Sequence, residues 1–234
     1  ESQAGVRLPL YLAHRSGVSP GEAEEIELKI LDETGWESFL SRYGAAFSAA
    51  FPGATLPEPD EAALKTEQAR HQGRSLAVLF FPPRGIGPTA WTVDEKERTQ
   101  IRRRFALLGQ TLDGMRIWDL RRAIAAVREI AGADQADLSL EASGVMAANV
   151  LYASLFESKI RSLDLHQLPF RHEDGPELLN VLRFTDLPRI AGMAGARCRL
   201  RIDSESAEKW GFLNELATKL AWPEGQVQIQ DISR

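Results

Sequence analysis

The chain has 234 residues, of which 44% are hydrophobic, and it carries a formal net charge of −5. A chain of this size buries one substantial core, so we predict a single domain over residues 1–234. The acidic balance excludes nucleic acid and anionic membranes as predicted partners, because both are recognised through an excess of Lys and Arg. The apolar runs are far shorter than the roughly 20 residues of a membrane-spanning helix.

The first residue is Glu1 rather than methionine, and no signal-peptide pattern follows it. We therefore interpret the chain as a processed protein or as an excised domain, in the second case the C-terminal part of a longer protein. The single cysteine, Cys198, excludes an intramolecular disulfide and a multi-cysteine metal site. It falls within a predicted strand, where a buried, unreactive thiol is expected. We predict neither a cofactor nor a metal site.

The first half of the chain alternates between strand and helix patterns. Alternation of apolar and polar residues predicts strands at residues 6–15 and 25–31. Helices are predicted at residues 36–51 and 62–72, between turn and loop signals. Residues 75–81 are almost continuously apolar, which is typical of a strand buried on both faces. The longest helical pattern covers residues 99–130, within which Gly109 and Gly114 indicate close packing or a break.

The second half continues this alternation. Strands are predicted at residues 136–142, 160–166, 197–202 and 226–232, and helices at 145–156 and 206–220. The order indicates βαβ units, and hence an α/β three-layer sandwich with a mostly parallel central sheet. Ligands of such sheets gather at the carboxyl ends of the strands, so the residues that follow each strand are the candidates for function.

Two basic or glycine-rich features are interpreted as structural. The loop Arg84-Gly85-Ile86-Gly87-Pro88 has two glycines of a dinucleotide-binding motif, but the third is missing, so the glycines are expected to shape a turn. A basic cluster alternates with acidic residues, which favours an ion-paired helix face over a nucleic-acid site. Its members are Arg98, Arg102, Arg103, Arg104, Arg121 and Arg122.

The turn after residues 136–142 reads Leu140-Glu141-Ala142-Ser143-Gly144-Val145. A sharp strand-to-helix turn with small residues around a serine is what a nucleophile elbow requires. This turn, the segments 83–89 (PRGIGPT) and 102–119, and the following Leu151-Tyr152-Ala153 resemble α/β-hydrolase domains of the acetyl xylan esterase type. They are similar above all to the esterase-like regions of large bacterial proteins. The resemblance covers residue 6 to the end and implies the α/β-hydrolase fold and a periplasmic or secreted location.

Carried over residue by residue, the family pattern aligns Gly144 with the nucleophile, so the serine is missing. A shift of one residue makes Ser143 the nucleophile, but Glu141 and Val145 then stand where the family has glycines and crowd the turn. Asp203 follows the strand at 197–202 and matches the family's triad acid. The loop after residues 25–31 begins Asp32-Glu33, and two carboxylates there oppose a developing oxyanion.

The family's histidine should follow the last strand, where the sequence has Asp231-Ile232-Ser233-Arg234. A serine without such a base is a weak nucleophile. His172 is the best replacement, unless a downstream histidine supplies the base. His166 and His172 show no metal-ligand spacing, and an ordinary ion pair of a loop histidine with Glu173 or Asp174 is favoured.

Three functions are compatible with these residues. The leading hypothesis is a degenerate, catalytically inactive esterase-like domain with a structural or interaction role, packed against an active hydrolase domain of the same polypeptide. The second is a carboxylic ester hydrolase that uses Ser143, Asp203 and His172. The third is a module that binds a carbohydrate or a small acyl ligand in the former active-site cleft.

Overall fold

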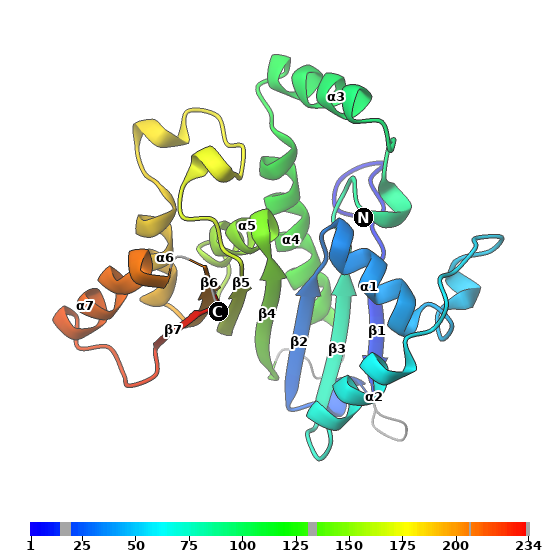
Figure 1. Cartoon of the computed structure of the whole chain (residues 1–234), viewed down its shortest axis with the longest axis horizontal. Helices are drawn as coiled ribbons and strands as arrows, with labels where there is room; N and C mark the ends of the chain where they lie inside the picture. The colour runs from blue at the N-terminus through cyan, green and yellow to red at the C-terminus, as the bar shows by residue number, and fades with distance from the viewer. Residues whose placement is uncertain (15–19, 131–134, 206, 233–234) are drawn as a thin grey trace.

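The computed structural model describes residues 1–14, 20–130, 135–205 and 207–232 (Figure 1). These residues form one seven-stranded sheet with the order β1-β3-β2-β4-β5-β6-β7. β1 pairs antiparallel with β3, and every other pair is parallel. The strands are Tyr11–His14 (β1), Glu25–Ile30 (β2), Leu76–Phe81 (β3), Asp137–Ser143 (β4), Ile160–His166 (β5), Arg199–Ser204 (β6) and Val227–Asp231 (β7).

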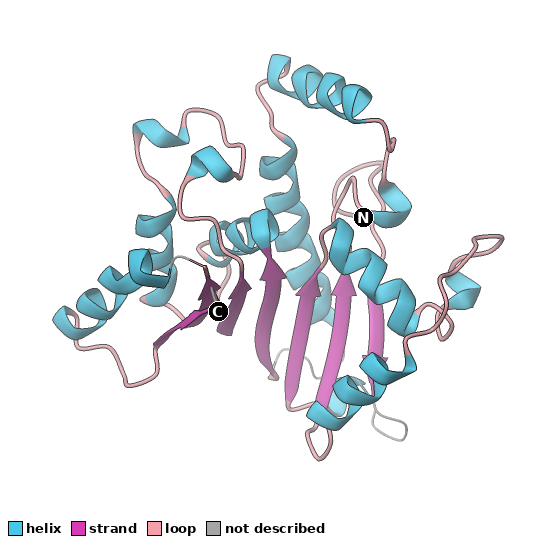
Figure 2. Cartoon of the chain, viewed as in Figure 1, coloured by secondary structure: helices cyan, strands magenta, loops and turns pink. Residues whose placement is uncertain are grey.

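Helices lie on both faces of this sheet, so the predicted α/β three-layer architecture is confirmed (Figure 2). None of the helices that the described residues form is long and apolar enough to cross a membrane. The helices are Glu33–Tyr43 (α1), Glu61–Arg70 (α2), Glu95–Leu107 (α3), Leu112–Glu129 (α4), Gly144–Ser154 (α5), Leu187–Gly195 (α6) and Phe212–Lys219 (α7).

Several predicted boundaries were wrong. The predicted helix over residues 99–130 is two helices, because the chain turns at Gly109 with φ +72° and α4 starts afresh with Thr111 accepting a hydrogen bond from the Gly114 amide at 3.0 Å. α1 starts earlier than predicted because Asp32 caps it, accepting from the Gly35 amide at 2.7 Å. It ends at Tyr43 rather than at residue 51.

The ends of two other predictions differ as well. β1 covers only Tyr11–His14 of the predicted strand at 6–15, and Arg15 lies outside the described residues. The predicted helix at 206–220 begins at Ser206, which is also outside them, and α7 itself starts at Phe212 after a short 3-10 turn. Helix α6 was not predicted at all, since its sequence LPRIAGMAG contains a proline and two glycines.

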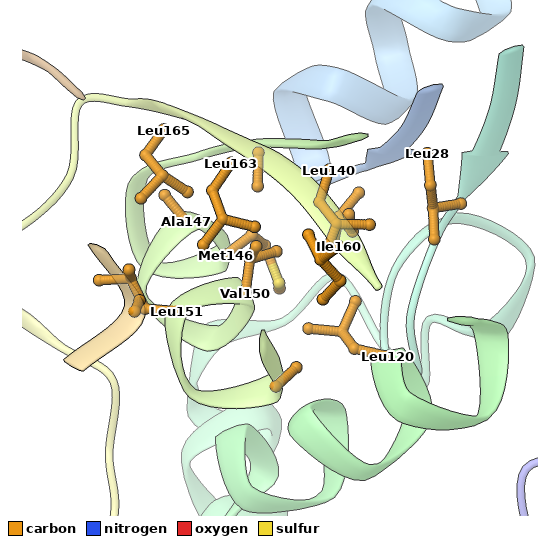
Figure 3. Packing of buried hydrophobic residues seen from close by; sticks show 14 of the residues in the cluster. Leu28, Leu120, Leu140, Met146, Ala147, Val150, Leu151, Ile160, Leu163 and Leu165 are labelled. Atoms are coloured by element: carbon orange, nitrogen blue, oxygen red, sulfur yellow. The ribbon is translucent and has the colours of Figure 1, made fainter. Parts of the chain in front are cut away.

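The larger core lies between the sheet and helices α4, α5 and α6 (Figure 3). In β4 the even-numbered residues Leu138, Leu140 and Ala142 are buried, and in β5 Leu163 and Leu165 have no exposed surface. Successive side chains of a strand point to opposite faces, so these residues all face the helices. The helices contribute apolar side chains to the same core, among them Leu120, Met146, Ala147, Val150 and Leu151.

The opposite face of the sheet is covered only in part. Helices α1 and α2 lie over the β1–β3 side of the sheet, whereas none of the helices that the described residues form lies in front of β5, β6 and β7 (Figure 1). An aromatic cluster fills the covered part, which explains why β3 is buried on both faces. Its rings belong to Tyr11, Trp36, Phe39, Tyr43, Phe47, Phe51 and Phe80.

The loop after β3 is fixed by a buried ion pair. Asp119 has no exposed surface and accepts two hydrogen bonds from the Arg84 guanidinium, from Nε at 2.7 Å and from Nη2 at 2.6 Å. Arg116 Nε donates to the Arg84 carbonyl at 3.1 Å. A bidentate pair of this kind fixes orientation as well as charge, so the loop is anchored to α4.

A matched pair of leucine substitutions tests the position of the core. Leu140→Ala leaves a cavity between β4 and the helices, because this side chain is 1% exposed, and we expect a loss of about 2–5 kcal/mol in the free energy of unfolding. Leu108→Ala changes an exposed side chain and should cost less than about 0.5 kcal/mol. Urea unfolding of both variants measures the difference, and equal losses would contradict the assigned core.

Candidate functional site

The turn between β4 and α5 has the sharpness of an elbow. Ser143 ends the strand in an extended conformation, with φ −124° and ψ 151°, and Gly144 starts the helix with φ +56°. A nucleophile elbow places its nucleophile at the tip of such a turn. The residue at the tip here is Gly144, as the family pattern predicts, and it brings no side chain. Apart from its two chain neighbours and the adjoining backbone of α5, no atom of the described residues lies within 4 Å of the place that a Cβ would take.

Ser143 faces sideways instead of standing at the tip. It shares the sheet face of Ser139 and Glu141, and in register it lies beside His166 of β5, which lies beside Asp203 of β6. Ser143 and His166 both line a cavity of about 170 Å³. The Ser143 side chain makes no cap hydrogen bond to α5, and no hydrogen bond joins Ser143 Oγ to a histidine among the described residues.

Asp203 pairs with His166 rather than with His172. The distance between His166 Nδ1 and Asp203 Oδ2 is 2.7 Å, and His166 Nε2 lies 3.7 Å from Asp164 Oδ1. A triad histidine needs one nitrogen for the acid and the other for the serine. Here both nitrogens face carboxylates. His166 is the last residue of β5, and Asp203, which was expected to follow its strand, is the next-to-last residue of β6 and lies beside His166 in register.

His172 is held by other groups. Its Nδ1 lies 3.0 Å from the Pro176 carbonyl, and its Nε2 lies 2.7 Å from the Tyr152 hydroxyl. A carbonyl only accepts, so Nδ1 carries the proton and Nε2 accepts from Tyr152. No ion pair joins His172 to Glu173 or Asp174, although all three are described, so the expected pairing is replaced by these contacts. They fix the loop that contains His172 on α5.

A cavity of about 450 Å³ lies beside the tip of the elbow. Val145, the residue after the tip, lines it together with Asp32 and Glu33, so the two carboxylates of the predicted oxyanion loop do lie in the same cavity. Acidic residues outnumber basic ones in its lining, and a surplus of negative charge opposes an oxyanion. The charged lining residues are Asp32, Glu33, Asp113, Glu173, Asp174, Glu177, Arg102 and Arg116.

A charged network lies on the same sheet face as Ser143, centred on Lys29 of β2. Lys29 Nζ lies 3.0 Å from Glu67, 3.2 Å from Glu27 and 3.3 Å from Glu141. Burial lowers the pKa of Lys29, but these three carboxylates outweigh burial and hold the pKa above its ordinary value. The ammonium group therefore stays charged and keeps the acidic side chains together.

Glu141 is a carboxylate of this network whose pKa is raised well above its ordinary value. Burial raises its pKa to about 7, and a hydrogen bond with Glu27 acts in the same direction, against the opposing charge of Lys29. Burial likewise raises the pKa of Asp164. Glu141 and Glu27 are neighbouring buried carboxylates, and such a pair shares a proton more readily than both members ionise. The network therefore holds a proton near neutral pH.

One group of described residues has the composition of a metal site. Ligand atoms of Glu141, Asp164 and His166 lie within 4.8 Å of one another. An imidazole and two carboxylates suit a transition metal. However, Lys29 already lies against Glu141, and Arg201 Nε lies 3.0 Å from Asp164 Oδ1. The carboxylates are thus neutralised by protein cations, and we assign no metal here.

Comparison with known proteins identifies the fold. No protein-family model and no curated protein matches the sequence. Among similar solved structures, a candidate acetyl xylan esterase from Bacteroides fragilis has a TM-score of 0.64 at 9% identity, over 99% of this chain and 64% of its own. Dipeptidyl peptidase 4 of Porphyromonas gingivalis has a TM-score of 0.57 at 10% identity, over 98% of this chain and 30% of its own. An esterase of Pyrococcus furiosus has a TM-score of 0.56 at 9% identity, over 97% of this chain and 76% of its own.

The chain therefore has the α/β-hydrolase fold, and its structural neighbours include esterases and peptidases. This confirms the predicted resemblance at the level of the fold. The chain spans less than two thirds of the length of the first two neighbours. At about one tenth sequence identity the likeness extends to the architecture and not to the activity.

The elbow can be tested with two glycines in open space. Gly144→Ala adds a Cβ that meets no atom within 4 Å, but the backbone has φ +56°, so we expect a loss of about 1–2 kcal/mol in the free energy of unfolding. Gly211→Ala also meets no atom and has φ −55°, so it should be neutral or slightly stabilising. Urea unfolding compares them, and equal effects would contradict the strained elbow.

The raised pKa of Glu141 predicts a pH dependence of stability. A raised pKa means that the folded state binds the proton more tightly, so this stabilisation is full below the ordinary value of 4.5 and is lost as pH rises to about 7. Glu141→Gln removes the loss. Relative to the parent protein, the variant should therefore gain on the order of 1–3 kcal/mol between about pH 5 and pH 8.

Urea unfolding at both pH values measures this gain. The control is Glu37→Gln on the exposed side of α1, which should leave the pH dependence unchanged. A parallel shift of both variants, or no shift for Glu141→Gln, would show that Glu141 titrates as an ordinary surface carboxylate.

Proposed function

We propose that this domain is a non-hydrolytic member of the α/β-hydrolase fold with a structural or interaction role. The single observation that carries the proposal is Gly144 at the tip of the elbow, with its positive φ and open space above it. The turn is that of an elbow, but the atom that attacks a carbonyl is missing. A nucleophile elbow needs both the sharp turn and a nucleophilic side chain at its tip.

The surroundings of the elbow support the same conclusion. His166 has a carboxylate near each ring nitrogen, and His172 is engaged by Tyr152 and Pro176, so neither histidine is free to take a proton from Ser143. The acidic cavity beside the tip disfavours an oxyanion. The fold is kept by a complete apolar core, while the groups of the catalytic site are replaced.

The role of such a domain is to contact other protein. We propose that it packs against an active hydrolase domain of the same polypeptide. The solved neighbours are longer than this chain, which spans 64% and 30% of the first two. A decayed domain of this fold offers a rigid sheet with loops at its carboxyl edge, and such loops are where α/β folds make contacts.

One observation favours a second candidate, a carboxylic ester hydrolase. Ser143, His166 and Asp203 are register partners on three adjacent strands. A rotation of the His166 ring that turned Nε2 from Asp164 toward Ser143 would complete a Ser-His-Asp arrangement. The sequence-based version of this candidate used His172 as the base, and the present geometry favours His166.

Turnover of an activated ester separates the candidates. We expect the purified chain to hydrolyse 4-nitrophenyl acetate no faster than the Ser143→Ala variant does, and a fluorophosphonate probe to leave Ser143 unlabelled. The physical reason is that no hydrogen bond joins Ser143 Oγ to a histidine among the described residues. Turnover that disappears in Ser143→Ala and in His166→Ala would overturn the proposal and establish the ester hydrolase. Retention of a glycan without turnover would favour the ligand-binding module instead.

A further inference from the structure

Helix α2 has little part in the apolar packing of the fold. It lies in front of the sheet, between loops at residues 52–60 and 71–75 (Figure 1). None of its ten residues, all of which are described, belongs to either of the two hydrophobic clusters. Glu67 is the only one of them that is buried. A helix is usually held on a sheet by the burial of an apolar face, so α2 needs another attachment.

The carboxylate of Glu67 supplies that attachment. Its side chain is 5% exposed, Oε1 lies 3.0 Å from Lys29 Nζ of β2, and Oε2 lies 3.2 Å from Arg42 Nη1 of α1. Next to the first turn, the Asp60 amide donates to the Ser41 carbonyl at 2.9 Å. Loss of one member of a buried ion pair leaves the other charge buried without compensation. The ion pairs of Glu67 therefore hold α2 on the body of the molecule.

The position of α2 controls access to a cavity. Glu67 lines the cavity of about 170 Å³ that Ser143 and His166 also line. If α2 moves away from the sheet, Glu67 leaves this wall and water reaches Glu141, which lines the same cavity. Helix α2 thus has the place of a lid over the polar face of the sheet.

Lys29 connects this lid to Glu141. Its ammonium lies 3.0 Å from Glu67 and 3.3 Å from Glu141, so the two carboxylates share one cation. With the proton on Glu141, two cations face two ionised carboxylates, namely Lys29 and Arg42 against Glu27 and Glu67. Loss of that proton adds a third negative charge, which opposes Glu67 in the closed position.

Linkage gives the direction of the effect. Burial raises the pKa of Glu141 to about 7, with Glu27 acting in the same direction and Lys29 and His166 against it. In water the ordinary pKa of this group is 4.5, so the closed position gains full stabilisation below that pH and loses it as pH rises through about 7. The other titratable groups around the cavity and beside its carboxylates are Asp32, Arg42, Tyr43, Glu67, His71 and Asp164.

We propose that α2 is a pH-sensitive lid, which the ion pairs of Glu67 hold closed and which opens the cavity of Ser143 and His166 as Glu141 loses its proton. The lid governs access to the cavity, whether or not the cavity serves hydrolysis, so this proposal stands apart from the proposed interaction role.

Hydrogen exchange of the full chain tests the lid. Amide exchange is measured at about pH 5.5 and pH 8.5 and corrected for the intrinsic rates, because a detached helix of ten residues is marginal in water. Amides of α2 should be less protected than those of α5, and their protection should fall on the order of tenfold at the higher pH. Equal protection of α2 and α5, or protection of α2 that does not change with pH, would overturn the proposal.

Glu141→Gln identifies the titrating group. Glutamine is neutral like the protonated carboxyl, so α2 should keep its low-pH protection at the higher pH. The control is Glu61→Gln, an exposed carboxylate on α2 itself, which should show the pH dependence of the parent chain. The lid is wrong if Glu141→Gln follows the parent chain, or if Glu61→Gln removes the pH dependence.

A second pair of variants tests what holds the lid. Glu67→Gln should lower the protection of α2 at the lower pH by at least about tenfold, because it removes the buried charge between Lys29 and Arg42. Leu64→Ala shortens a half-buried apolar side chain of the same helix and should have a smaller effect. The protection of α5 shows that both variants fold. A larger effect of Leu64→Ala than of Glu67→Gln would show that apolar contacts hold α2, and would overturn the ion-pair lid.

Discussion

The two-residue period of β4 is the constraint on which the candidate site depends. Leu138, Leu140 and Ala142 must face the helices, because the core between the sheet and α4 to α6 is closed around them. The odd-numbered residues therefore face the other way, and Ser143 is one of them. The chain leaves the strand at the next residue, so the tip of the elbow falls on Gly144. Sliding the strand by one residue to bring Ser143 to the tip would turn every β4 side chain to the wrong face.

The same alternation explains why charged groups gather beside the elbow. Where β2, β4, β5 and β6 place apolar side chains toward the helices, their alternate residues meet on the opposite face. Within the described part of the chain, no helix covers this face over β5 and β6. Lys29, Glu141, Asp164 and Arg201 thus form one row across four strands. Burial opposes ionisation of the two carboxylates in this row, while the cations Lys29 and Arg201 at its two ends favour it. The balance is closest at Glu141, which has carboxylates as well as Lys29 beside it.

Much of the fold could be predicted from the sequence, because its strands carry strong patterns. β5 has the predicted bounds, β2 is one residue shorter at its end, and β4 is shifted by one residue. The errors occur where local signals conflict with packing. The helical pattern over residues 99–130 left Gly109 as either a close contact or a break, and the chain turns there. α6 has a proline in its first turn and two glycines, and it is a helix because its apolar stripe packs on the sheet next to α5.

Candidate site residues could be predicted from the sequence only where their place along a single strand was enough to suggest a role. Gly144 and Asp203 could be proposed as site positions from the sequence, because each lies close to the carboxyl end of its own strand. The pairing of Asp203 with His166 depends on which strands become neighbours, and this is a property of the sheet order. His166 ends β5 and lies in register between Ser143 and Asp203, so the orientation of its ring decides which neighbouring side chain its second nitrogen faces. Asp164, two residues earlier on the same strand face, favours the network, because its carboxylate attracts the ring nitrogen that a serine would need.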